Sequence, residues 1–391
     1  MDRTIKAGFL SIQNYLDKNA FSGTLYYMYH ALKSRGIEVV DLKRPQAHSW
    51  IGRKVNRVFN RVCFGSAEGN LNKTAFKRQV QKILENEACD LIIAPVASDE
   101  VDLVETSIPI IFVSDATPKL VHNKYYNLYF DNTKFAAASK QEERVLSKAR
   151  KIIYPSRWSA KSAIRDYGVD PAKISILPFG ANLDFAPKID EIRARLMLSG
   201  CKLLFIGKDW HRKGGDIAYE TLKALLDLGI DAELTMIGCT LPKDLSARVG
   251  KERLTMIPFL NKNTKRERDR LHQILLDAHF FLLPTRADCS PIVLCEAAAF
   301  GLPVLSSRVG GIQTIVEEGV NGYTFSDSSD ARAYAETIAA VFSDQSRYER
   351  LVLSSRQTYE DRLNWKAWAD GIYDVMLEVL ATNSSKTLTK A

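Results

Sequence analysis

Two carboxylates, Asp288 and Glu296, enclose a short apolar stretch in the sequence DCSPIVLCE. Ser290 and Pro291 are typical of a helix start, because a proline at an early helical position forfeits no hydrogen bond. Glu296 then falls inside the helix, about two turns beyond Asp288. The alanines that follow Glu296 predict close packing, where an unpaired carboxylate is costly. A ribose diol, which donates two hydrogen bonds, would satisfy Glu296, whereas Asp288 by itself is also typical of a helix cap.

A second stretch, FIGKDWHRKGGD, is suited to binding an anion. It places a glycine at the end of an apolar strand, three cations in a tight loop and two glycines at a helix start; the cations are Lys208, Arg212 and Lys213. Glycines allow close approach of the backbone, a helix N-terminus offers free N–H groups, and cations neutralise phosphate. The alternative is an exposed turn with chance lysines. We favour the anion site, because three cations at one strand end are more than a turn needs.

Several motifs that identify other enzyme classes are absent from the sequence. It lacks GxGxxG, GxxxxGK[ST] and GxSxG, which removes the main support for a dinucleotide oxidoreductase, a P-loop NTPase or a serine hydrolase. It also lacks HExxH, a histidine cluster and an Asp-x-Asp pair. A metal-dependent transferase is therefore disfavoured, and we expect neither a metal nor a cofactor.

Short apolar segments alternate with amphipathic ones along the chain, as in KAGFLSI followed by GTLYYMYHALKSRG. This alternation predicts parallel sheets with helical crossovers. A second series of the same kind begins at CKLLFIG, after a segment rich in turn residues. We therefore expect an α/β fold with two Rossmann-like doubly wound domains, whose strand ends face each other across a central cleft.

The length of 391 residues suits two hydrophobic cores better than one. The expected division places residues 1–185 in an N-terminal domain and residues 186–356 in a C-terminal domain. An amphipathic helix over about 357–383 follows, and a polar tail over 384–391 is expected to be disordered.

The composition of the sequence bears on where in the cell the protein is expected to lie. No stretch is long and apolar enough for a membrane span, and the apolar run near the N-terminus is too short for a signal peptide. The six cysteines lack CxxC spacing and indicate reduced, buried thiols rather than a disulfide or zinc framework. A cytoplasmic location is the expectation.

The positive charge is uneven, with ten Lys or Arg residues and one acid between Lys43 and Lys82. Within this window Arg53, Arg57 and Arg61 recur at four-residue spacing. A basic amphipathic helix suits an anionic surface at the inner face of a membrane, and the alternative is a solvated face beside the cleft. Nucleic acid is disfavoured as a partner, because no recognition motif is present.

Five segments together resemble the retaining nucleotide-sugar glycosyltransferases of family 4, the large GT-B group: GKDWHRKGG, PFGANLD, LLPTRADCSPIVLCEAAAFGLPV, GGI and EEGVNGYTF. The resemblance covers nearly the whole chain, is strongest from Pro178 to Phe325 and is weakest between Lys43 and Lys82. Its most specific element is a Glu-x7-Glu motif, here Asp288-x7-Glu296. It implies a GT-B fold whose C-terminal helix crosses back to the N-terminal domain. It also implies metal-independent transfer of a sugar from a nucleoside diphosphate sugar to an acceptor hydroxyl, with retention of the anomeric configuration.

The resemblance further implies roles for individual side chains. Glu296 would bind the ribose of the donor, and Asp288 would approach the donor sugar. Lys208 and Lys213 would hold the diphosphate, with Arg212 beside them. Front-face attack, in which the leaving phosphate accepts the proton of the acceptor, is the mechanism that the family implies.

Backbone groups at strand and helix ends complete the expected site. Ser290, Ile292 and Val293 would donate N–H groups to phosphate; Pro258 and Leu260 would flank the base; Gly23 lies in the turn after the first strand. Asp115 stands at a strand end where the family often has a histidine. It would hydrogen-bond sugar hydroxyls or act as a general base.

The acceptor class stays open among a carbohydrate, a lipid-linked sugar and a small molecule, as in polysaccharide or glycolipid biosynthesis. Two other functions share the fold: a GT-B nucleotide-sugar epimerase and a two-domain sugar-binding protein without catalysis.

Overall fold

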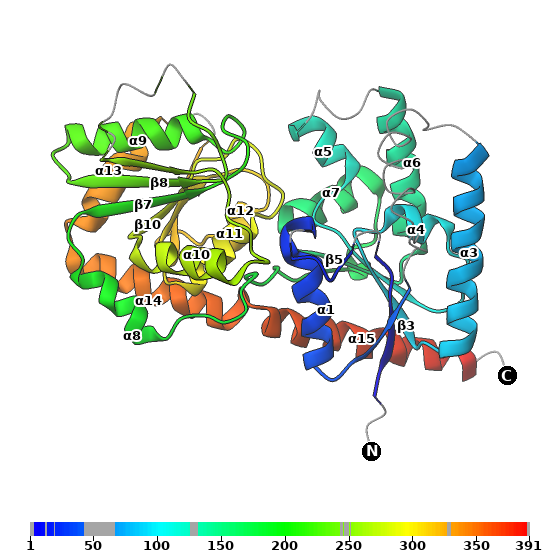
Figure 1. The fold of residues 1–391 in the computed structure, drawn as a ribbon. Helices are drawn as coiled ribbons and strands as arrows, with labels where there is room; N and C mark the ends of the chain where they lie inside the picture. The colour runs from blue at the N-terminus through cyan, green and yellow to red at the C-terminus, as the bar shows by residue number, and fades with distance from the viewer. Residues whose placement is uncertain are drawn as a thin grey trace.

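The computed structural model describes residues 4–11, 14–18, 20–42, 67–125, 132–242, 245, 250, 252–326 and 330–388. Within them, two α/β domains lie side by side, each built on a parallel sheet (Figure 1). The prediction of two doubly wound domains is therefore confirmed. Residues 43–66 of the basic window lie outside the described residues, and so does the basic helix expected there.

Six parallel strands form the first sheet among the described residues, in the order β2-β1-β3-β4-β5-β6. The strands are β1 (Lys6–Phe9), β2 (Glu38–Asp41), β3 (Leu91–Pro95), β4 (Ile110–Val113), β5 (Lys151–Tyr154) and β6 (Ile174–Ile176). The helices between them are α1 (Thr24–Ser34), α3 (Ala67–Glu87), α4 (Ser98–Leu103), α5 (Pro118–Tyr125), α6 (Asn132–Lys148) and α7 (Arg157–Tyr167). Short 3-10 helices, η1 (Ala20–Gly23) and η2 (Pro171–Lys173), precede α1 and β6.

The second sheet also has six parallel strands in the part of the chain that the structure describes, in the order β12-β11-β10-β7-β8-β9. The strands are β7 (Cys201–Ile206), β8 (Ala232–Ile237), β9 (Leu254–Ile257), β10 (Phe280–Leu283), β11 (Val304–Ser307) and β12 (Gly322–Phe325). The helices are α8 (Ile189–Ala194), η3 (Arg195–Met197), α9 (Gly215–Asp227), α10 (Lys265–Asp277), α11 (Ile292–Ala299), α12 (Ile312–Ile315), α13 (Ala331–Phe342), α14 (Gln345–Arg362) and α15 (Trp365–Leu388).

Each sheet has a point where the chain reverses the direction in which strands are added. In the first sheet β1 lies between β2 and β3, and in the second β7 lies between β8 and β10. Loops that leave the carboxyl ends of strands at such a point diverge and open a crevice. The loops after β1, β7 and β10 therefore face the ligand-binding edge of each sheet.

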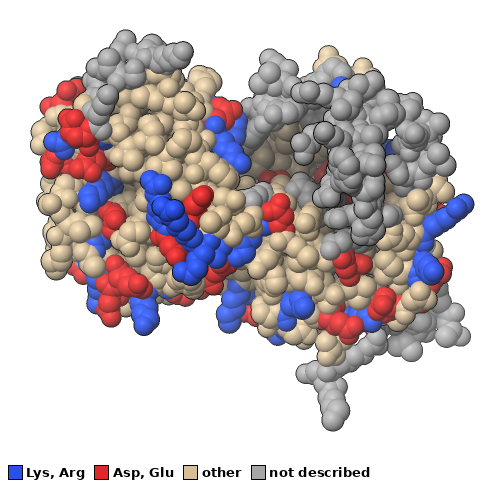
Figure 2. Space-filling model, in the orientation of Figure 1, with Lys and Arg blue, Asp and Glu red and all other residues tan. Residues whose placement is uncertain are grey.

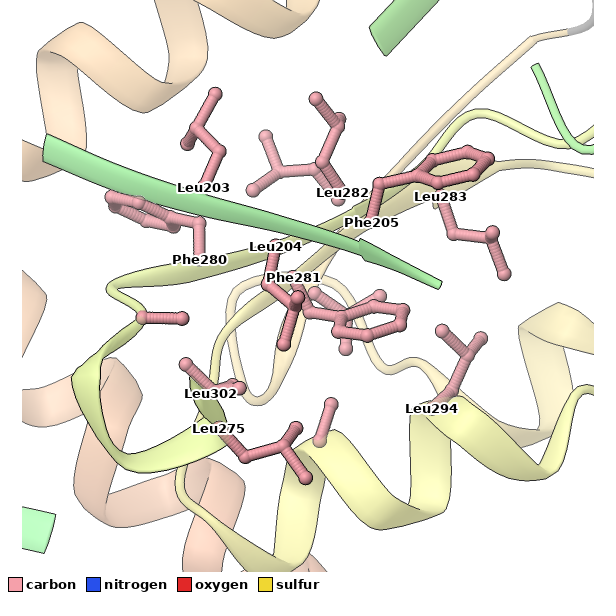
Figure 3. Packing of buried hydrophobic residues seen from close by; sticks show 14 of the residues in the cluster. Leu203, Leu204, Phe205, Leu275, Phe280, Phe281, Leu282, Leu283, Leu294 and Leu302 are labelled. Atoms are coloured by element: carbon pink, nitrogen blue, oxygen red, sulfur yellow. The ribbon is translucent and has the colours of Figure 1, made fainter. Parts of the chain in front are cut away.

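The central strands of both sheets are buried on both sides. Every residue of β3, β4, β10 and β11 is buried. Helices cover both faces of such a sheet, which explains why these strands are continuous apolar runs without alternation. In the second domain Leu294 of α11 points into this layer, against Leu204 and Phe281 of the sheet (Figure 3). The core thereby fixes α11, which carries Glu296.

The end of the chain forms two helices where one helix over 357–383 was expected. α14 ends at Arg362 and α15 begins at Trp365, with Asn364 between them. The Asn364 Nδ2 donates to a carbonyl in the last turn of α14 at 2.7 Å, and its Oδ1 accepts from an N–H in the first turn of α15 at 2.8 Å. The expectation was wrong because Asn364 caps both helix ends and interrupts the periodic pattern.

α15 crosses back beneath the first domain, as expected (Figure 1). Its side chains Trp368, Ile372 and Met376 are buried together with Met28 and Leu32 of α1. The last helix of the chain thus completes the core of the first domain.

α15 continues to Leu388, into the segment over 384–391 for which the sequence predicted a polar, disordered tail. No glycine or proline stands there to end the helix. Residues 389–391 lie outside the described part of the chain. Within that part, no helix is both long enough and apolar enough to cross a membrane.

The chain passes between the domains twice, in the linker that contains Gly180 and at the α14–α15 junction, and these two segments lie against each other. The N–H of Ala181 donates to the carbonyl of Leu363 at 2.9 Å, and a Cβ on Gly180 would lie 2.3 Å from the backbone nitrogen of Trp365. The buried Asn182 accepts a hydrogen bond from Trp365 Nε1 at 2.9 Å. The linker and the α14–α15 junction therefore form one packed unit.

Asn182→Ala should lower the free energy of unfolding by about 2–3 kcal/mol, because it leaves the buried Trp365 N–H without its acceptor. Urea denaturation followed by tryptophan fluorescence measures the loss. Asn263→Ala, which removes an exposed asparagine bonded to Asp17, is the matched control and should stay within about 0.5 kcal/mol of wild type. Equal losses in the two variants would contradict a structural role for the crossing.

Candidate functional site

A cleft of about 450 Å³ lies at the carboxyl ends of both sheets, between the two domains. Its volume falls in the range of small-molecule sites, roughly 300–1,000 Å³. Ten residues predicted from the sequence line it: Asp115, Lys208, Arg212, Lys213, Leu260, Asp288, Ser290, Ile292, Val293 and Glu296. The fold thus gathers residues from both domains around one cavity.

Two predicted residues, Gly23 and Pro258, are not among the residues that line the cleft. Gly23, with φ of 89°, ends the turn before α1, and its neighbours Ser22 and Thr24 line the cleft instead. Pro258 follows β9, and the next residue, Phe259, lines the cleft in its place. Each of them therefore adjoins the cleft through its neighbours in the chain, and its role in binding stays a prediction.

Glycines shape the loop between β7 and α9. Gly214 has φ of 76°, and a Cβ there would lie 1.9 Å from the carbonyl oxygen of Pro284. A Cβ on Gly207 would lie 2.9 Å from the side chain of Lys213. The loop therefore packs directly against the residues after β10, and the stem of Lys213 passes over Gly207 toward the cleft.

This packing brings Lys213 against Asp288. The Lys213 Nζ forms a short ion pair with the Asp288 Oδ2, and both side chains are mostly buried. On the other side, Gly310 has φ of 56°, and a Cβ there would lie 1.7 Å from the Asp288 carbonyl oxygen. Asp288 is therefore held on two sides, with a cation fixed beside its carboxylate in the cleft wall.

Glu296 is the most deeply buried acid of the cleft, with a side chain only 1% exposed. Its Oε1 accepts a hydrogen bond from Lys262 Nζ. Its Oε2 is buried and has no hydrogen-bond donor among the described residues. A buried carboxylate oxygen without a donor is costly, so a ligand that supplies a hydroxyl here would gain from the contact.

The two remaining cations of the β7–α9 loop lie at the cleft wall. The Lys208 Nζ is 5.4 Å from the centroid of the Phe259 ring, a cation–π arrangement. The Arg212 Nη1 donates to the carbonyl oxygen of Ala287 at 3.0 Å. Arg212 thus joins the loop to the segment that precedes Asp288, while Lys208 lies on the side of the cleft near β9.

The first domain contributes a strained turn to the cleft. Phe21, Ser22 and Gly23 all have positive φ, at 47°, 56° and 89°. Left-handed backbone is unfavourable at the first two, which are not glycine, and strain of this kind is typical of ligand sites. Asn182 Nδ2 stabilises the turn by donating to the Ser22 carbonyl at 2.9 Å.

Asp115 lies at the end of β4 and lines the same cleft as Asp288. Burial, and to a lesser degree the negative charge of Asp288, raise the pKa of Asp115 to about 6. The Ser159 hydroxyl donates to the Asp115 carbonyl and fixes the backbone there. Asp115 is therefore an acid whose protonation changes near neutral pH.

The cleft residues that sequence reasoning did not predict include Lys18, Phe179, Lys262 and Cys289. Lys18 and Lys262 stand in loops several residues beyond β1 and β9, where the sequence pattern gives no signal for either. Cys289 was expected to be buried and is partly exposed, because it shares the cleft-lining turn with Asp288. Among the described residues, no three His, Cys, Asp or Glu side chains form a group that could hold a metal ion.

Two family models match adjacent parts of the chain. A model described as Glycosyltransferase Family 4 matches residues 23–185. A model described as Glycosyl transferases group 1 matches residues 200–344, which include the cations of the β7–α9 loop and both acids.

Curated relatives match this chain over part of their length. The D-inositol 3-phosphate glycosyltransferase of Xylanimonas cellulosilytica is 28% identical over 253 residues, which cover 60% of this chain and 58% of that protein. Spore coat protein SA of Bacillus subtilis is 27% identical over 198 residues, which cover 48% of this chain and 51% of that protein. The chain thus spans between half and three fifths of the length of these relatives.

Solved structures share the fold over nearly the whole chain. Sucrose-phosphate synthase from Thermosynechococcus elongatus superposes with a TM-score of 0.68 at 18% identity, covering 97% of this chain and 100% of that one. Anabaena HepE in complex with UDP-glucose gives 0.64 at 16% identity, covering 96% and 100%. The likeness shows that the two domains adopt the GT-B arrangement.

The raised pKa of Asp115 predicts a pH-dependent effect of Asp115→Asn. The folded protein binds more protons than the unfolded chain between about pH 4 and pH 6, so Asp115 costs stability that grows as pH rises through this window. The free energy of unfolding of the variant, relative to that of wild type, should therefore increase by about 1–2 kcal/mol as pH rises from 5 to 8.

Denaturation of both proteins at each pH measures this gain. The control is the exposed Asp361→Asn, whose difference from wild type should stay constant. A constant difference for Asp115→Asn as well would contradict the assignment.

Proposed function

The chain belongs to the Glycosyltransferase Family 4 and Glycosyl transferases group 1 proteins, and we propose that it transfers a sugar from a nucleoside diphosphate sugar. The acceptor is a hydroxyl group, and the anomeric configuration is retained. The observation that carries the proposal is Glu296, a carboxylate with an unpartnered buried oxygen in the same cleft as the three cations of the β7–α9 loop. A buried acid suits a ribose diol, and the nearby cations suit a diphosphate.

In this proposal the donor lies along the carboxyl edge of the second sheet. Its ribose hydroxyls donate to Glu296, and its base rests between Phe259 and Leu260 after β9. Its diphosphate lies against Lys208 and Lys213. The order base, ribose, diphosphate then runs from β9 toward β10, and it ends with the sugar beside Asp288.

The hardest step is departure of the diphosphate while positive charge develops on the sugar ring. Cations fixed in advance stabilise such a leaving group without reorganisation at the moment of reaction. Lys213 is suited to this task, because Asp288 and the backbone at Gly207 fix its position. Lys208 and Arg212 add positive charge, and the proposal therefore requires no metal.

We adopt front-face attack because the family resemblance implies it. The leaving phosphate accepts the proton of the acceptor hydroxyl, so the new bond forms on the face from which the phosphate departs. Asp115 approaches from the first domain and hydrogen-bonds sugar or acceptor hydroxyls. With a pKa of about 6, it is mostly ionised at pH 7 and accepts such bonds.

A thermal-shift screen against UDP, GDP, ADP and their sugars tests the proposal. A ligand that binds only the native state raises the melting temperature, by an amount that depends on its concentration relative to Kd. We expect one nucleotide to raise the Tm of wild type and to have a much smaller effect on Glu296→Ala. The neighbouring structure that contains UDP-glucose makes UDP the first ligand to try.

The proposed function is wrong if none of these nucleotides shifts the Tm or if Glu296→Ala responds as wild type does. Transfer itself is assayed with the selected donor and candidate acceptors, starting with D-inositol 3-phosphate, the acceptor named for several relatives. A product formed from the donor alone would indicate an epimerase instead.

Lys213→Met should lower the transfer rate roughly a hundredfold, because it removes one fixed donor to the leaving diphosphate. Steady-state kinetics with the selected donor measure the loss, which should fall mainly on kcat. Lys223→Met is the matched control, since Lys223 lies on α9, directly after the loop of Lys213, and pairs with Glu220. A wild-type rate in correctly folded Lys213→Met would remove Lys213 from the mechanism.

A further inference from the structure

We propose that Lys262 closes the ribose-binding carboxylate Glu296 in the ligand-free protein and moves into a neighbouring cavity when a nucleotide binds. The inference rests on the proposed function, because it assigns the ribose to Glu296. It adds a residue outside the predicted site and a change of ion-pair partner on binding.

The first observation is that Glu296 is sealed. Its side chain is 1% exposed, while that of Lys262 is 24% exposed. The Lys262 Nζ occupies Oε1, and Oε2 is buried without a donor among the described residues. A ribose diol that bonds to both oxygens competes with the ammonium group for Oε1.

The second observation is that the backbone around Lys262 is fixed. The Lys262 carbonyl accepts a hydrogen bond from Arg268 Nη1 at 2.8 Å, and the N–H of Asn261 donates to Glu267. Both partners belong to the first turns of α10, so the loop is attached to that helix. Only the lysine side chain, with its four rotatable bonds, is left to move.

The third observation is a second cavity of about 180 Å³ on the other side of Lys262. Lys262 and Leu271 line both cavities, so they form the wall between them. The second cavity also contains Asp184 and Asp269. A Lys262 side chain displaced from Glu296 therefore finds carboxylates within the adjacent space.

Asp184 is the better of these two new partners. It lies on the linker between the domains and accepts hydrogen bonds from Tyr27 at 3.0 Å and from Lys18. Arg268 lies 3.4 Å from its other oxygen. The Asp269 side chain is 56% exposed and that of Asp184 is 33% exposed, so solvent screens a pair with Asp269 more strongly. Basic side chains gather on this face over α10 (Figure 2).

The exchange of ion-pair partners allows the closed state to distinguish ligands that carry a ribose from ligands that do not. Hydroxyls of the ribose replace the ammonium group on Glu296, and the lysine regains a carboxylate in the second cavity. A ligand that carries only phosphate groups offers nothing to Glu296 and leaves the Lys262–Glu296 pair in place. Lys262 thereby lowers the affinity for every nucleotide while leaving the affinity for free diphosphate unaffected.

Isothermal titration of Lys262→Met with UDP, GDP and ADP tests the proposal. The nucleotide that wild type binds should bind the variant roughly tenfold more tightly, which corresponds to one charge-assisted hydrogen bond that no longer has to be broken. Inorganic pyrophosphate should bind both proteins equally or bind the variant slightly less tightly. Arg266→Met, which removes an exposed cation from the first turn of α10, just after the Lys262 loop, is the matched control and should not tighten nucleotide binding.

A double-mutant cycle separates the ion pair from general electrostatics. In a Glu296→Gln background, Lys262→Met should no longer tighten nucleotide binding, because the pair that it releases is already gone. Unchanged or weaker nucleotide binding by Lys262→Met would overturn the proposal and leave the proposed function standing. Absence of nucleotide binding by wild type would instead refute the proposed function, and the closing role of Lys262 with it.

Discussion

Exclusion of the Glu296 carboxylate from water is the constraint on which the site depends. A buried carboxylate without a counter-ion costs several kcal/mol, so the protein must supply a cation or a ligand must supply donors. α11 is otherwise an apolar helix buried in the core of the second domain, and Glu296 is its one charged residue. The core thus fixes the acid rigidly, and Lys262 balances its charge from a loop that the core does not contain.

The same rigidity reaches the cations through close backbone packing. Gly214 lies against Pro284, and Gly310 lies against Asp288, at separations that no side chain at either glycine would permit. Lys213 and Asp288 are far apart in the sequence, yet they meet because the loops after β7 and β10 leave the sheet at its switch point. The order of strands in the sheet determines which loops meet, and the glycines allow those loops to approach each other closely.

The sequence was sufficient to predict the features that depend on local pattern. Apolar segments separated by amphipathic helices predicted both parallel sheets, and residues near strand ends and helix starts predicted ten of the residues that line the cleft. Asn364 was missed because one capping side chain interrupts an otherwise continuous helical pattern. Lys262 was missed for a different reason: it stands in a polar loop, and only the tertiary fold brings that loop to Glu296.

Asp184 links the chemistry of the cleft to the relative position of the domains. It accepts hydrogen bonds from Lys18 and Tyr27 of the first domain and lies beside Arg268 of the second. Asn182, two residues earlier, bonds the strained turn at Ser22 and the α15 tryptophan. Because both chain crossings pack against each other here, a rigid-body opening of the cleft that preserves these contacts must pivot near this linker. Glu296 and Lys262 both belong to the second domain and would remain close during opening, whereas Asp115 and Asp288, on opposite domains, would separate. The part of the cleft proposed to bind the nucleotide therefore stays intact during opening. The part that faces the sugar is complete only when the two domains are closed.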